Sequence, residues 1–239
     1  MFLYSLLEVS EQATNVVKWI SIIGVVLLFV VIFFLSFFAQ KRWDTKQLAF
    51  AGVCVALSFI LAFIKIKPVQ NGGSVTLASF VPVMLYAFIY GPQSGFIVGL
   101  IHGLLNFIES PYILTPATFI FDYLLAFIGI GMMGFFGKIP RKPKAVTPLI
   151  LGAIIVFSLR FLFHFCSGAI FFLENAIWVD FPDWAISNAF IYSFVYQCIY
   201  IPADAIIATA VLILLGKTGI VDTLIKRLRK PVKNSETAV

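Results

Sequence analysis

The chain has 239 residues, of which 61% are hydrophobic and 12% are charged, and its formal net charge is +6. A soluble domain carries about 25% charged residues, so this chain could not cover a water-facing surface. The basic residues lie in short loops and in the C-terminal tail, which indicates membrane topology and gives no sign of nucleic-acid binding.

Apolar runs along the chain predict membrane helices, because a helix needs about 20 apolar residues to cross the hydrocarbon core. The run at 17–39 predicts an extra N-terminal transmembrane helix, and a block of six further helices follows it. We therefore expect an all-α integral membrane protein. The six helices of the block are expected at 46–66, 78–90, 94–109, 116–137, 147–172 and 187–215.

These helices divide the chain into three parts. Residues 1–43 hold the extra helix and its linker, 44–217 form the six-helix domain, and 218–239 form a basic tail. Lysines and arginines gather in the loop at 41–46, in the loop at 138–144 and in this tail. The positive-inside rule then predicts a multi-pass protein of the cell membrane with its N-terminus outside and its C-terminus in the cytoplasm.

A few ionisable side chains lie inside the apolar runs, where they are costly unless they are paired or face a cavity. Asp122 lies in one run, and Arg160, His164 and Gly168 share one helix face in another. We interpret them as a polar pocket in which Asp122 pairs with a cationic or amine-bearing ligand. Ring faces for stacking come from Tyr112, Tyr123, Phe172, Trp178, Trp184 and Tyr192.

Structural interpretations of the same residues stay open. A buried Asp122–Arg160 ion pair could lock two helices together, and His164 could be a hydrogen-bonded core residue. Asp204, on the last helix with Gln197, favours a structural hydrogen bond or a place near the cytoplasmic end. On the helix at 94–109, His102 is expected to make an interhelical hydrogen bond.

Small residues predict close helix contacts. The stripe Gly95, Gly99 and Gly103 favours packing inside the bundle, whereas Gly52 and Ala56 on the helix at 46–66 could also meet an external partner. No metal site or cofactor is expected, since the cysteines and histidines lack ligand spacing. The chain also lacks an HExxH motif and a serine with a clear general base, which argues against an enzyme.

Several ordered motifs make residues 46–217 resemble the thiamine-specific substrate-binding (S) component of energy-coupling factor (ECF) transporters. The motifs are Gly72–Leu77, Val81–Leu85, Gly91 with Gly95 through Leu105, Tyr112–Leu114, Asp122–Phe127, and the run from Arg160 through His164 and Gly168 to Phe172. The resemblance implies a six-helix fold with a ligand pocket near the outer face.

The resemblance also implies which residues bind the vitamin. They are Tyr112, Asp122, Tyr123, Arg160, His164, Gly168, Phe172, Tyr192 and Gln197. Gly52 and Ala56 match a pair that contacts the energising transmembrane subunit. Two departures stand out: the family has Asn where this chain has Gln197, and some members have Trp where this chain has Gly73.

The predicted function is therefore a high-affinity membrane subunit for thiamine uptake, working in the lipid bilayer with the ECF transmembrane subunit and two cytoplasmic ATPase subunits. The chain has no Walker A pattern, so ATP would be hydrolysed by those partners. Alternatives are an S component for a thiamine precursor or another heterocyclic vitamin, a solitary proton-coupled vitamin transporter, and a structural membrane protein without a ligand.

Overall fold

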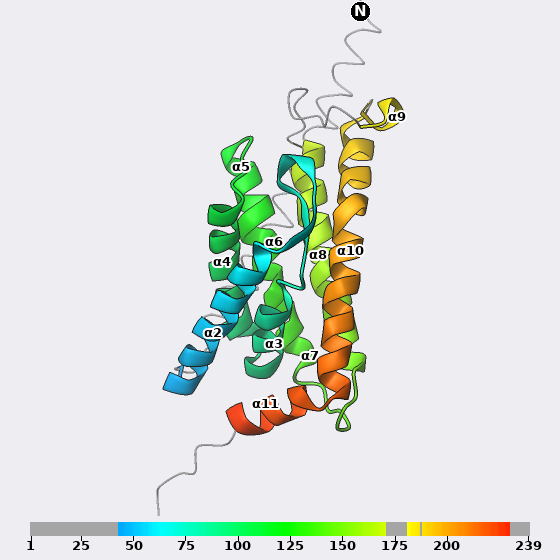
Figure 1. Ribbon diagram of the computed structural model, residues 1–239. Helices are drawn as coiled ribbons and strands as arrows, with labels where there is room; N and C mark the ends of the chain where they lie inside the picture. Colours follow the sequence, from blue (N-terminus) through cyan, green and yellow to red (C-terminus); the bar gives the residue numbers. More distant parts are fainter. Residues whose placement is uncertain (1–42, 171–180, 187, 230–239) are drawn as a thin grey trace, which may run out of the picture. The chain divides into compact units, whose positions relative to one another are not determined.

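The computed structural model describes residues 43–170, 181–186 and 188–229, and this part of the chain is mostly helical (Figure 1). The predicted helix at 17–39 lies outside the described residues. The longer described helices follow the predicted apolar runs in order. They are α2 (Thr45–Ala62), α3 (Val81–Tyr90), α4 (Pro92–Glu109), α8 (Thr147–Ile170) and α10 (Ala189–Lys217).

The run predicted as one helix at 116–137 is helical but irregular. It consists of α5 (Pro116–Phe119), the π-helical η2 (Ile120–Leu125), α6 (Ala126–Ile128), the 3-10 segment η3 (Gly129–Met132) and α7 (Met133–Phe136). A short helix, α9 (Asp183–Ile186), precedes α10.

The outer surface of this bundle is apolar. Among the described residues, three helices are long and apolar enough to cross a membrane: α2, α8 and α10. Large apolar side chains on them are exposed, including Val53 on α2, Ile154 on α8 and Ile206 on α10. Such a surface is suited to lipid, and the molecule is a multi-pass membrane protein.

The predicted helix at 46–66 is wrong at its C-terminal end, where a β-hairpin begins. Helix α2 ends at Ala62, and β1 (Lys65–Pro68) pairs antiparallel with β2 (Ser74–Thr76) around η1 (Gln70–Gly72). The tip turns through Asn71 and Gly72, whose φ angles are 60° and 86°. Asn and Gly tolerate this left-handed conformation best, so these residues explain how the chain reverses direction at the tip of the hairpin.

The glycine stripe of α4 packs inside the bundle, as predicted. A Cβ at Gly95 would meet Ala87 of α3, one at Gly99 would overlap the Phe127 carbonyl, and one at Gly103 would overlap the Tyr123 carbonyl. The helix backbones can approach this closely because the glycines have no side chain. The irregular run from η2 to η3 thereby lies directly against α4.

The predicted hydrogen bond of His102 is wrong. The ring is fully buried, and neither of its nitrogens has a hydrogen-bond partner among the described residues. Instead it lies edge-on to Phe80 and Phe127, with ring centroids 5.7 and 5.2 Å away. His102 is a packing residue behind the wall of the pocket described below.

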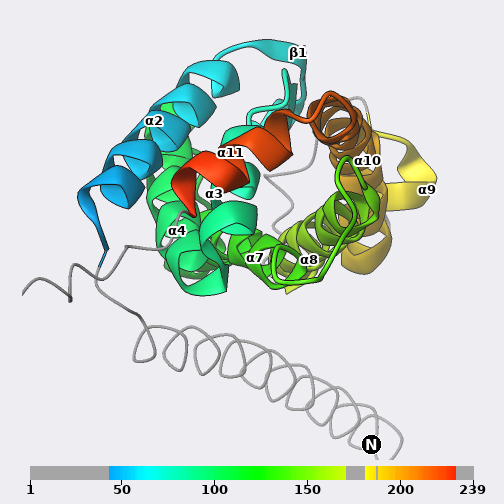
Figure 2. The ribbon, with the colours of Figure 1, turned by 90° about the horizontal axis from the view of Figure 1, so that it is seen from below.

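Helix α11 (Ile220–Leu228) lies across the end of the bundle opposite the hairpin (Figures 1 and 2). Asp222 of α11 accepts from Arg141 Nη2 at 2.6 Å and from the backbone N–H of Lys144 at 2.7 Å. Beyond the helix, Arg229 donates to the Phe88 carbonyl at 2.8 Å and to the Gly137 carbonyl at 3.2 Å. It therefore caps the carbonyl ends of α3 and α7, where a cation is favoured.

Candidate functional site

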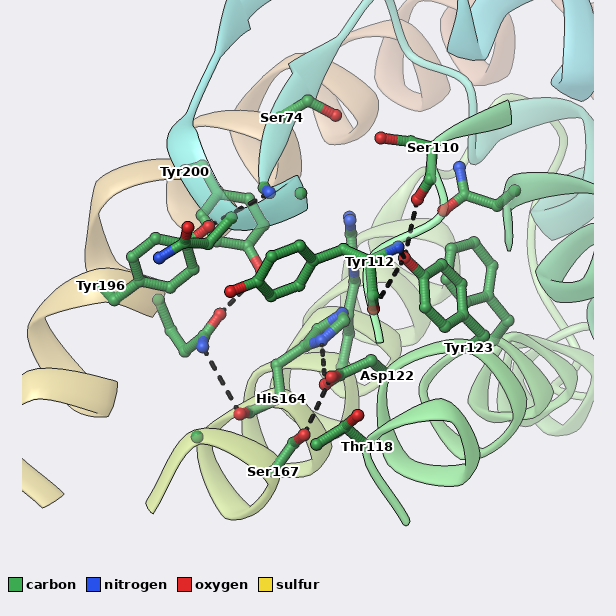
Figure 3. Close-up of a pocket in the computed structure, with 18 of the residues that line it drawn as sticks. Ser74, Ser110, Tyr112, Thr118, Asp122, Tyr123, His164, Ser167, Tyr196 and Tyr200 are labelled. Atoms are coloured by element: carbon green, nitrogen blue, oxygen red, sulfur yellow. Dashed lines mark hydrogen bonds and ion pairs between the residues drawn. The ribbon is translucent and has the colours of Figure 1, made fainter. Parts of the chain in front are cut away.

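The candidate site is a pocket at the hairpin end of the bundle (Figure 3). Its wall comes from the hairpin, the C-terminal end of α4, the loop after it, η2, α8 and α10. Of the residues predicted from the sequence, the structure places eight on this wall: Tyr112, Asp122, Tyr123, Arg160, His164, Gly168, Tyr192 and Gln197. Phe172 and Trp178 lie outside the described residues, and Trp184 is exposed on α9.

Asp122 is held by two side chains of α8. Its Oδ1 lies 2.8 Å from His164 Nδ1, and its Oδ2 accepts from Ser167 Oγ at 2.8 Å. Asp122 lies within the π-helical η2, and such turns often occur at functional sites because they re-aim side chains. A carboxylate is thus fixed in position while still lining the pocket.

The paired Asp122 leaves His164 with one nitrogen available. His164 Nε2 is buried and has no hydrogen-bond partner among the described residues. Because the contact at Nδ1 sets the ring orientation, Nε2 is the nitrogen that remains for a bound molecule. A ring that donates its Nδ1 proton to Asp122 presents an acceptor at Nε2.

Gln197 and Tyr200 extend this polar wall along α10. Tyr200 Oη donates to Gln197 Oε1 at 2.7 Å, and Gln197 Nε2 lies 3.4 Å from the His164 carbonyl. The glutamine is therefore oriented from both sides. Gln197 was predicted from the sequence, whereas Tyr200, which lines the pocket beside it, was not.

The Asp122–Arg160 ion pair considered from the sequence is absent from the described structure, and Arg160 pairs with Asp204 instead. Arg160 Nη1 lies 2.5 Å from Asp204 Oδ2, and the two side chains are 8% and 1% exposed. Asp204 lies on the same face of α10 as Tyr192, Tyr196 and Tyr200, because the four residues are spaced at intervals of four. The prediction of a structural hydrogen bond for Asp204 is confirmed, since Oδ1 accepts from the Thr76 N–H and Oγ1 at 3.1 and 3.0 Å.

Tyr112 and Tyr123 have different roles in the wall. Tyr123 Oη donates to the Ser110 carbonyl at 2.7 Å and accepts from the Tyr112 N–H at 2.9 Å, so it fixes the loop after α4. That loop projects the Tyr112 ring into the pocket (Figure 3). A Cβ at Gly72 would lie 2.9 Å from Tyr112 Cβ, so the hairpin tip closes tightly over the same ring.

A tyrosine ladder on α10, formed by Tyr192, Tyr196 and Tyr200, holds the tip of the hairpin. Tyr196 Oη donates to the Gln70 carbonyl and accepts from the Gly73 N–H at 3.1 Å. Tyr196 was not predicted from the sequence, although its four-residue spacing from Tyr192 is a usable signal.

Gly73 fits against this ladder because it has no side chain. A Cβ there would lie 2.7 Å from Tyr196 Oη and 3.1 Å from a ring carbon of Tyr200. Gly73, where the resemblance led us to expect Trp in some family members, is therefore crowded by tyrosines in this chain.

The base of the hairpin is tied to the other side of the pocket. Lys65 Nζ lies 2.8 Å from Glu109 Oε1 at the end of α4. Glu109 lines the pocket, and its side chain is only 5% exposed. The hairpin is thus fastened to α4 at its base and to α10 at its tip.

Gly168 allows α8 and α10 to pack closely. A Cβ there would overlap Ser193 Oγ and lie 3.0 Å from Ser193 Cβ on α10. Its role is therefore to bring α8 and α10 together beside the pocket, in addition to lining it.

The wall as a whole suits an uncharged or cationic ring. It combines a fixed carboxylate, an unpaired imidazole nitrogen, an oriented amide and several tyrosine faces. Within residues 43–170, 181–186 and 188–229, no three His, Cys, Asp or Glu side chains are grouped to hold a metal ion.

Comparisons with known proteins point to one family. A family model described as thiamine transporter protein matches residues 48–221. The thiamine transporter ThiT of Bacillus subtilis (strain 168) is 32% identical over 157 residues, which cover 62% of this chain and 78% of that protein. A solved structure of ThiT from Listeria monocytogenes shares the fold, with a TM-score of 0.61 over 73% of this chain and 94% of that chain at 22% identity.

Proposed function

The chain belongs to the thiamine transporter protein family, and on that premise we propose that it is the membrane-embedded subunit that captures thiamine for an ECF transporter. The family consists of transporters and is not an enzyme family. The observation that carries the proposal is a pocket in the membrane bundle that is lined by a fixed carboxylate, Asp122, and by several tyrosines.

The chemistry of thiamine matches this wall. Thiamine joins an aminopyrimidine ring to a cationic thiazolium ring, and it ends in a hydroxyethyl group. Asp122 attracts the cation or the amino group, and His164 Nε2 can accept a hydrogen bond from the amino group. Tyr112, Tyr196 and Tyr200 offer ring faces for stacking and for cation–π contact with the thiazolium.

The outer face of α2 is proposed as the contact for the transmembrane subunit. Gly52 and Ala56 are both exposed on this helix, and a Cβ at Gly52 would meet nothing within 4 Å. Small residues let a second helix approach closely. The two cytoplasmic ATPases would then act through that subunit.

The proposed orientation places the pocket outside and the α11 end in the cytoplasm. The loop after α7 carries Lys138, Arg141, Lys142 and Lys144, and α11 carries Lys226 and Arg227. The positive-inside rule assigns this basic end to the cytoplasm. The other end carries fewer basic residues, Lys65 and Lys67 of β1, and Lys65 pairs with Glu109.

Equilibrium binding tests the function. The purified full-length chain in detergent is titrated with thiamine in a calorimeter, with the aminopyrimidine alcohol half of thiamine as a second ligand. Saturable binding with thiamine the tighter ligand supports the proposal. Tighter binding of the pyrimidine alone indicates a precursor transporter, and absence of binding to folded protein contradicts a thiamine site.

A further inference from the structure

Arg160 presents a cation to the pocket, but the carboxylate that neutralises it lies behind the wall. Arg160 lines the pocket, whereas Asp204 does not. The guanidinium lies over the Phe80 ring at 4.2 Å and pairs with Asp204 Oδ2 at 2.5 Å. A bound molecule can therefore contact Arg160 but not Asp204, the carboxylate that neutralises it.

Asp204 is fixed in this role by both of its oxygens. Oδ2 accepts a hydrogen bond from the Arg160 guanidinium, and Oδ1 accepts from the backbone N–H and the hydroxyl of Thr76 in β2. Thr76 Oγ1 in turn lies 2.7 Å from Ser79 Oγ. A buried carboxylate with this many donors holds its charge in place beside Arg160.

The other charges of the pocket wall are also paired, with one exception. Glu109 is neutralised by Lys65 at 2.8 Å, just as Arg160 is neutralised by Asp204. Asp122 has no lysine or arginine partner among the described residues, and its contacts are His164 and Ser167. The unbalanced charge of the wall is therefore the carboxylate of Asp122.

We propose that Asp204 determines ligand charge by neutralising Arg160, so that the pocket accepts the cationic vitamin and rejects its phosphorylated forms. An unpaired arginine in a pocket of low dielectric constant is a strong site for a phosphate. When Arg160 is paired with Asp204, its buried Nε still has no hydrogen-bond partner in the described residues. This Nε–H can donate to a neutral oxygen such as a hydroxyl. This inference rests on the proposed thiamine site and adds to it a residue outside the pocket wall.

The test compares thiamine with thiamine monophosphate on the full-length chain. Asp204→Asn removes the neutralising charge, so the preference for thiamine over the monophosphate is expected to fall by about tenfold or more. Arg160→Gln leaves the buried carboxylate unopposed, so the same preference is expected to rise. The double variant Arg160→Gln/Asp204→Asn restores the charge balance, and its preference is expected to return to within about threefold of wild type.

The opposite signs separate charge selection from a structural role. If Asp204 only supports the fold, Asp204→Asn and Arg160→Gln weaken both ligands by similar factors, and the inference is wrong. The melting temperature of each variant reports folding, and if Asp204→Asn does not fold, the Arg160→Gln and double variants decide. Wild-type protein that binds neither ligand contradicts the proposed function itself, which is a distinct outcome.

Discussion

His164 Nδ1 lies 2.8 Å from Asp122 Oδ1 across the interface between α8 and η2. The contact places a carboxylate and an imidazole side by side on the pocket wall. His164 Nε2 has no hydrogen-bond partner in the described structure. The two side chains therefore act as one unit toward a ligand, with the aspartate setting the ring orientation of the histidine.

Asp122→Asn and His164→Ala are each expected to weaken thiamine binding at least tenfold, or about 1.4 kcal/mol. The first removes the charge that attracts the vitamin, and the second removes the acceptor at Nε2. Calorimetric titration of the purified variants measures the effect. Asp222→Asn on α11 makes the same chemical change at the other end of the bundle and should leave the affinity unchanged. Wild-type affinity in both pocket variants would disprove the site.

Tyr196→Phe is expected to speed thiamine release about fivefold, because the ring loses its hydrogen bonds to Gln70 and Gly73 at the hairpin tip. A neutral hydrogen bond contributes about 1 kcal/mol. Dissociation of radiolabelled thiamine after dilution gives the rate. Tyr90→Phe is the matched control, since the Tyr90 hydroxyl is buried without a partner among the described residues. Equal release rates in all three proteins would show that the hairpin contact does not retain the ligand.

Gly168→Ala is expected to destabilise the fold by about 1–3 kcal/mol, the usual cost of overpacking. The new methyl group overlaps Ser193 Oγ between α8 and α10. Thermal unfolding in detergent measures the loss, and adding Ser193→Gly should recover most of it. Gly52→Ala serves as the control, because its methyl group would meet nothing within 4 Å. A melting temperature unchanged by Gly168→Ala would mean that the two helices are not packed this closely.

Gly52→Trp and Ala56→Trp are expected to abolish co-purification with the ECF transmembrane subunit while leaving thiamine affinity within about twofold of wild type. Both positions are exposed on α2, and neither lines the pocket. Ile206→Trp, at an exposed position on α10, is the control for a bulky ring on the outer surface. Retained assembly in both α2 variants would place the partner on another face.

The apolar runs were enough to predict most helices, because each is longer or more apolar than a soluble helix. The hairpin was missed since its strands have four and three residues, too few for a periodic pattern. The expected end of the helix at 46–66 was wrong because Ile64 and Ile66 continue the apolar run into β1. Such short strands depend on tertiary contacts, here the hydrogen bonds of Thr76 in β2 to Asp204 of α10.

The site residues that share one helix face could be predicted from the sequence. Contacts between residues of different helices could not. Arg160, His164 and Gly168 stand at intervals of four and could be read together. The partner of Arg160 could not be predicted, because Asp122 and Asp204 are both carboxylates inside apolar runs. The packing of α8 against α10 determines that Arg160 pairs with Asp204. Tyr196 and Tyr200 have the spacing of Tyr192 and were open to the same argument.

Arg229 donates to carbonyl groups at the ends of α3 and α7, more than 90 residues earlier in the chain. During synthesis these helix ends reach the membrane long before their cap is translated. The α11 end of the bundle is therefore capped last, after the helices that line the pocket have been synthesised. A chain that ends before Arg229 keeps every residue that lines the pocket but leaves the carbonyls of Phe88 and Gly137 without their cap.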